Sequence, residues 1–148
     1  MSQASFRIDS PSPALALQEA EKYFNFMLPS MLYGGMDVEF EEFKAELESG
    51  AYLLIRVWAG EDLISVSAVQ VRELTEGRDL YIVATSSNRN INAWIDDFDR
   101  VLVKLAHEAE CDTITVMTRS GMGRIAKRAG YKIHQVVIRK RVSEWAVH

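Results

Sequence analysis

WIDDFDRVLVKLAHEA, residues 94–109, is the stretch with the clearest pattern in this chain of 148 residues. Its apolar side chains recur every three or four positions, and charged side chains alternate with them. The apolar positions are Trp94, Ile95, Phe98, Val101, Leu102, Leu105, Ala106 and Ala109. This spacing is that of a helix with one buried face. We therefore predict a long helix over residues 94–109 that covers a sheet.

The segments on either side of this helix have the character of strands. Residues 80–84, LYIVA, form a continuous apolar run, which is typical of a strand buried on both faces. Residues 52–59 and 63–72 are rich in β-branched and aromatic side chains and are separated by Gly-Glu-Asp, a hairpin signal. Residues 113–118, TITVMT, form a further strand after the helix. The pattern predicts a mixed sheet with residues 80–84 at its centre.

The remaining segments complete one α/β (α+β) domain that covers residues 1–148. We predict a strand at 5–9, a helix from Leu15 that Pro29 ends, a loop at 29–37, a helix at 38–49, a short helix at 122–129 and a last strand at 131–141. The expected core contains Ile82, Phe98, Leu102, Leu105, Ile114 and Val116.

The composition is that of a folded protein, with 48% hydrophobic and 26% charged residues. The single cysteine, Cys111, excludes an internal disulfide, and only three histidines are present, so we expect no metal site. The first residues lack the pattern of a signal peptide, and no run approaches the ~20 apolar residues that cross a bilayer. We expect a cytoplasmic protein without membrane contact.

Charge is distributed unevenly along the chain. Residues 1–118 carry 9 basic and 20 acidic side chains, whereas residues 119–141 carry 8 basic side chains and no acidic one. Such a block is either a solvated face or a surface for an acidic partner. Few aromatic residues accompany it, so we do not expect a nucleic-acid partner. We expect contact with another protein or a second copy through Met31, Leu32, Tyr33, Met36, Arg139, Lys140 and Arg141; alternatively, the loop packs on its own core.

The order of the predicted elements resembles the Gcn5-related N-acetyltransferase (GNAT) fold, including that of small GNAT-like proteins encoded by tailed phages. Ala106-x-x-Ala109-x-Cys111-Asp112-Thr113-Ile114 and the later Ile125-x-x-x-x-Gly130-Tyr131 are similar to the family's closing segments. The resemblance implies a mixed sheet of about six strands with helices on both faces. It also implies a site for acetyl-coenzyme A between the fourth and fifth strands.

The family's pyrophosphate loop has the pattern Arg/Gln-x-x-Gly-x-Gly/Ala, whose glycines let backbone N–H groups approach the phosphates. The matching positions in this chain are Arg89, Asn92, Ala93 and Trp94, which would contact the cofactor if it binds. Asn92 and Trp94 replace the two glycines, and two aspartates in the following helical turn oppose a bound anion. The resemblance therefore leads us to expect a degenerate site without a cofactor.

The family's usual proton donor is a tyrosine in the short helix before a Gly-aromatic pair. Alignment on Gly130 and Tyr131 places Ala126 at that position, so the catalytic residue is unknown. Tyr81 on the predicted central strand is a candidate replacement; alternatively, its ring belongs to the core or to the face of the sheet. Two positions of the family mechanism thus carry different chemistry. We expect a non-catalytic binding or assembly module, either in a phage particle or against a host protein. The alternative is an N-acetyltransferase that transfers an acetyl group from acetyl-coenzyme A to an amine.

Overall fold

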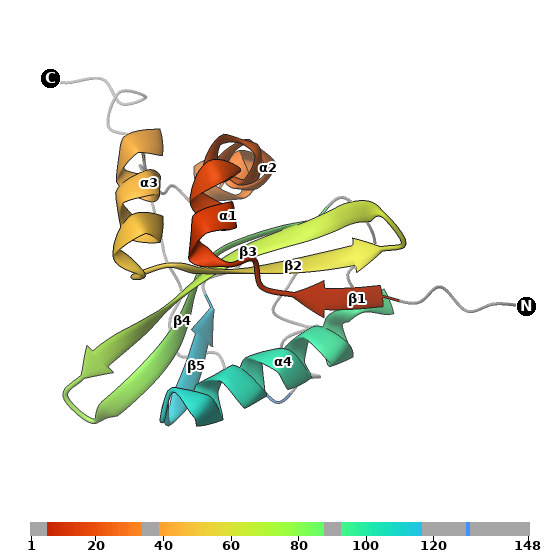
Figure 1. Ribbon diagram of the computed structural model, residues 1–148. Coiled ribbons are helices and arrows are strands. Elements are labelled where there is room, and N and C mark those ends of the chain that lie inside the picture. The colour runs from red at the N-terminus through yellow and green to blue at the C-terminus, as the bar shows by residue number, and fades with distance from the viewer. Residues whose placement is uncertain (1–5, 34–38, 88–92, 117–129, 131–148) are drawn as a thin grey trace, which may run out of the picture.

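The computed structural model describes residues 6–33, 39–87, 93–116 and 130 of the chain (Figure 1). Its elements follow the predicted order, except that the first predicted helix is divided at Glu19 into two helices. They are β1 (Phe6–Asp9), α1 (Pro13–Gln18), α2 (Ala20–Tyr33), α3 (Phe40–Ser49), β2 (Leu53–Ala59), β3 (Asp62–Leu74), β4 (Gly77–Ser87), α4 (Ile95–Glu108) and β5 (Thr113–Val116).

The described strands form one mixed sheet in the order β1-β2-β3-β4-β5. Neighbours are antiparallel except for β4 and β5, which are parallel. The parallel pair is possible because α4 carries the chain back across the sheet between the two strands. β4 is an interior strand, as expected, although β3 is the middle one of the five described. The predicted α/β class with a mixed sheet is confirmed.

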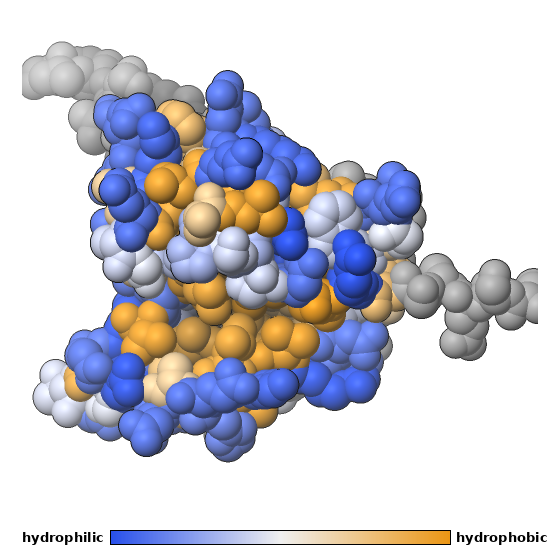
Figure 2. Space-filling view, viewed as in Figure 1, coloured by the Kyte–Doolittle hydropathy of each residue, from blue (hydrophilic) through white to orange (hydrophobic). Residues whose placement is uncertain are grey.

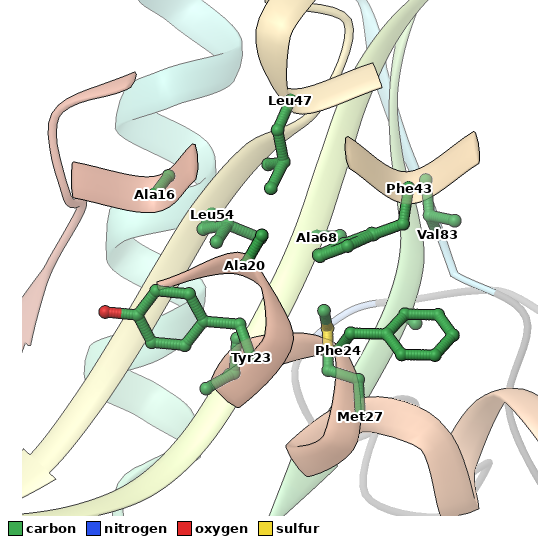
Figure 3. Packing of buried hydrophobic residues seen from close by; sticks show 12 residues of the cluster. Ala16, Ala20, Tyr23, Phe24, Met27, Phe43, Leu47, Leu54, Ala68 and Val83 are labelled. Atoms are coloured by element: carbon green, nitrogen blue, oxygen red, sulfur yellow. The ribbon is translucent and has the colours of Figure 1, made fainter. Parts of the chain in front are cut away.

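Helices cover both faces of the sheet. α1, α2 and α3 lie on one face and α4 lies on the other (Figure 1). The alternation of side chains along each strand separates two apolar clusters accordingly. On the first face, the cluster combines Tyr23, Phe24 and Met27 from α2 with Phe43 and Leu47 from α3 and with residues of the sheet (Figure 3).

The second cluster lies under α4 and confirms the predicted helical stripe. Trp94, Phe98, Leu102 and Ala106, each four residues from the next, are buried against strand residues that include Ile82. Of the other expected core residues, Leu105, Ile114 and Val116 are partly buried and pack against this cluster. The amphipathic pattern therefore identified the packing face correctly.

The prediction that Pro29 ends its helix is wrong. α2 continues through Pro29 to Tyr33, so residues 29–33 are helical rather than a loop. A proline inside a helix removes one backbone hydrogen bond, to the carbonyl four residues earlier. That carbonyl belongs to Asn25, which is exposed and can be solvated instead.

Two predicted elements, the short helix at 122–129 and the strand at 131–141, lie outside the described residues. Within the described part of the chain, none of the helices has the length and apolar character needed to cross a membrane.

Candidate functional site

The feature that distinguishes β4 from a regular strand is a bulge at Val83. Ala68 of β3 pairs with Ala84, whereas the next residue, Val69, pairs with Ile82, so Val83 is the extra residue. Val83 and Ala84 both belong to the cluster under α1–α3, although consecutive strand residues normally face opposite ways. Bulges bend a strand and are enriched beside active sites.

The described pairing between β4 and β5 runs from Asp79 with Thr113 to Ile82 with Val116, the last described residue of β5. On its other side β4 stays paired with β3 as far as Ser87.

The N-terminus of α4 follows shortly after β4 in the chain. Trp94 is the N-cap residue, and among the described residues no side-chain cap accepts a hydrogen bond from the backbone N–H groups of the first turn. Ala93 before it is exposed, as are Asp96 and Asp97 in the first turn. Asp97 is paired with Arg100 at 2.9 Å, which partly offsets its charge. The helix end can therefore donate N–H groups to an anion, although Asp96 opposes it.

Trp94 lies differently from what its place in the loop pattern suggests. Its side chain is 1% exposed and meets Phe98 edge to face, with ring centroids 5.5 Å apart. The ring packs in the core under α4 rather than projecting outward at this position of the loop pattern. The sequence signal was present, since Trp94 begins the four-residue stripe of that helix.

Tyr81 lies on β4, two residues before the bulge, and is partly buried on the α1–α3 face of the sheet. The guanidinium carbon of Arg72 lies 3.9 Å from the centroid of its ring. Arg72 is held by Asp79, which is fully buried and also accepts hydrogen bonds from Thr113 and Thr115. The sequence prediction missed this cluster. The signal that could have found the Arg72–Asp79 pair is the register of the hairpin, because counting residues outward from the β3–β4 turn places Arg72 opposite Asp79.

A second tyrosine, Tyr52, also packs against the α1–α3 cluster. Burial raises the pKa of its phenol, and the carboxylates of Glu46 and Glu42 and the nearby Tyr81 raise it further. Tyr52, the residue before β2, therefore lies close enough to the acidic face of α3 and to Tyr81 to interact with them electrostatically.

Two other chemically active side chains among the described residues are poor candidates for catalysis. His107 is exposed on the polar face of α4. The pKa of Cys111 is raised chiefly by burial, which makes its thiol less reactive.

Several predicted site residues cannot be placed. Those that lie outside the described residues are Arg89, Asn92, Met36, Arg139, Lys140 and Arg141, and the same holds for the side chains of Met31, Leu32 and Tyr33. Their roles stay predictions.

Comparison with known proteins identifies the fold. No family of known proteins matches the sequence, and no curated protein does. Among solved structures, a predicted acetyltransferase with acetyl-CoA from Clostridium acetobutylicum is similar, with a TM-score of 0.68 at 13% identity over 95% of this chain and 99% of that one. An aminoglycoside N-acetyltransferase in complex with CoA has a TM-score of 0.66 at 10% identity, over 95% and 96% of the two chains.

A third similar structure is glucosamine-6-phosphate N-acetyltransferase from Arabidopsis thaliana. Its TM-score is 0.64 at 12% identity, and the match covers 93% of this chain and 99% of that chain. At these identities the similarity establishes the architecture, which is the GNAT fold. The narrower resemblance to phage proteins stays a prediction.

Proposed function

We propose that this chain of GNAT fold is an N-acetyltransferase that uses acetyl-coenzyme A and acts on an amine. The observation that carries the proposal is the β-bulge at Val83 in the interior strand β4. A bulge bends its strand, and this strand leads in the chain to the N-terminus of the long helix α4. The similar structures that contain acetyl-CoA or CoA support the same reading.

The described residues fit the cofactor at the start of α4. Within the described part of the chain the first-turn N–H groups of this helix have no side-chain cap, and the exposed Ala93 beside them is small. The burial of Trp94 removes the steric objection at that position, while Asn92, the other replaced glycine, lies outside the described residues. N–H groups at a helix N-terminus favour phosphate, so the backbone from Ala93 to Asp97 would hold the pyrophosphate.

Acetyl-coenzyme A would supply an activated acetyl thioester, and the protein would have to orient it and manage protons. Tyr81 is the described side chain best placed for proton donation, since it lies two residues before the bulge. Tyr81→Phe removes only the hydroxyl. We expect acetyl-coenzyme A to bind this variant as it binds the parent, whereas turnover falls by roughly 100-fold or more.

The first experiment is calorimetric titration of the protein with acetyl-coenzyme A. It is followed by mass spectrometry of a panel of amines that have been incubated with the protein and acetyl-coenzyme A. Binding together with an acetylated product supports the proposal. Absence of binding at millimolar cofactor would refute it.

A pair of variants that each neutralise one carboxylate of α4 tests the position of the cofactor. Asp96→Asn removes an exposed carboxylate from the first turn of α4, so we expect binding to tighten on the order of threefold. Glu108→Gln makes the same change in charge at the other end of the helix and should leave the affinity unchanged. Equal effects of the two variants would place the cofactor elsewhere.

The second candidate is the non-catalytic binding or assembly module. Exposed apolar surface favours it, because Figure 2 shows such surface between α4 and the strands above it. Leu53, Val71 and Val103 are large apolar side chains that stay 38%, 39% and 40% exposed. The exposed carboxylates of α3 add a charged face.

Light scattering at low and high salt tests this candidate. If α4 takes part in self-association, Val103→Gln should weaken it, whereas Lys104→Gln, at the adjacent exposed position, should not. A monomer at every concentration and salt strength would rule out self-association. Unchanged pull-down partners after replacement of Arg139, Lys140 and Arg141 by Glu would remove the predicted role of the basic block.

A further inference from the structure

Asp79 joins three strands on the α1–α3 side of the sheet. Its side chain is fully buried, and it lies on β4 between Arg72 of β3 and Thr113 of β5. One carboxylate oxygen, Oδ2, accepts from Nη2 of Arg72 at 2.7 Å and from Nε at 3.3 Å. The other, Oδ1, accepts from Oγ1 of Thr113 at 2.8 Å and of Thr115 at 2.9 Å. The buried charge is thus fully paired, as a buried carboxylate must be.

Arg72 connects this carboxylate to Tyr81. In the β3–β4 ladder Arg72 lies opposite Asp79, and Tyr81 is two residues further along β4, so the two side chains are diagonal neighbours on one face. The guanidinium carbon is 3.9 Å from the ring centroid, well within the range of a cation–π contact. A planar guanidinium held at two nitrogens has little rotational freedom, so the surface that it presents to the ring is fixed.

We propose that Arg72 and Asp79 are positioning residues that set the orientation of the Tyr81 ring. Arg72 contacts the ring directly, and Asp79 acts through Arg72. The catalytic meaning of this arrangement rests on the proposed function, in which Tyr81 donates a proton. Holding the ring in one orientation keeps its hydroxyl in one place relative to the bulge at Val83. Positional accuracy of this kind is a large part of catalysis.

Fluorine NMR of the full chain labelled with 3-fluorotyrosine tests the orientation without reference to activity. Tyr81→Phe identifies the Tyr81 signal among those of the 5 tyrosines. In Asp79→Asn, the amide oxygen can still accept from the two threonines, but the amide nitrogen cannot accept from Arg72. We expect this change to displace the Tyr81 signal by more than its line width. An unmoved signal would overturn the proposal.

Two further variants separate positioning from general loosening of the sheet. Thr113→Val removes one hydrogen bond to Asp79 but leaves the Arg72 contact, so the Tyr81 signal should stay in place. Arg72→Met removes the guanidinium itself from a side chain that is 35% exposed, and it provides the test if Asp79→Asn does not fold. It should displace the signal as Asp79→Asn does. Equal displacement of the Tyr81 signal in Thr113→Val would show that the signal responds to general loosening of the sheet and not to loss of the Arg72 contact.

Kinetics test the catalytic consequence. In Asp79→Asn and Arg72→Met we expect turnover to fall by about 10- to 100-fold while KM for acetyl-coenzyme A stays unchanged. A displaced Tyr81 signal with full turnover would overturn the positioning role. If the parent chain transfers no acetyl group, the proposed function fails, and the fluorine signals still decide whether the pair holds the ring.

Discussion

Replacing Trp94 by alanine should destabilise the protein rather than open a cofactor site. The side chain is 1% exposed. A buried tryptophan removes roughly 150–250 Å² from water, which at about 25 cal/mol per Å² corresponds to about 4–6 kcal/mol. The edge-to-face contact with Phe98 adds about 1 kcal/mol. Against this, Nε1 is buried and has no hydrogen-bond partner in the described structure, at a cost of about 1–3 kcal/mol.

The net expectation for Trp94→Ala is a loss of about 3–5 kcal/mol in the free energy of unfolding. Urea denaturation followed by circular dichroism measures it, since that signal does not depend on tryptophan. Trp94→Phe is the matched control and should cost only about 1 kcal/mol, because it also removes the buried N–H that has no acceptor. A loss below about 1 kcal/mol in Trp94→Ala, with tighter binding of acetyl-coenzyme A, would refute the placement of the ring in the core.

Three other predictions concern a glycine with positive φ, the reactivity of the single cysteine and the core under α4. Gly77→Ala should cost about 3 kcal/mol in urea denaturation, because Gly77 has φ +145°, a backbone conformation that L side chains rarely adopt, and the carboxylate of Asp112 would also have to move away from the new Cβ. Gly60→Ala, at φ +62° with open space around it, should cost only about 1 kcal/mol, and equal losses would contradict the greater strain at Gly77. Because burial raises the pKa of Cys111, iodoacetamide should alkylate it at pH 8 more slowly than free cysteine, with the rate still rising at higher pH. Leu102→Ala, at a position 2% exposed, should cost about 2–5 kcal/mol, and a negligible loss would show that α4 packs otherwise.

The sequence by itself determined the order of the described elements and the buried face of α4. These properties depend on local periodicity: Phe98, Leu102 and Ala106 recur at helical spacing, and residues 80–84 form one apolar run. The residues that end helices are local signals as well, and Gly50 at the end of α3 adopts the left-handed conformation at φ +82°. Short-range patterns of this kind can be recognised in the sequence without knowing which segments they pack against.

Only the tertiary structure decided where individual side chains of the candidate site point. A loop pattern placed Trp94 beside a cofactor, but the apolar surface under α4 buries its ring. Likewise, α2 continues through Pro29 because packing of its apolar face compensates for the lost hydrogen bond. The bulge at Val83 depends on the register between β3 and β4, and the Arg72–Asp79–Thr113 cluster joins residues from three strands. Such features depend on contacts between segments far apart in sequence. A shift of one residue in the register of two strands changes which side chains meet.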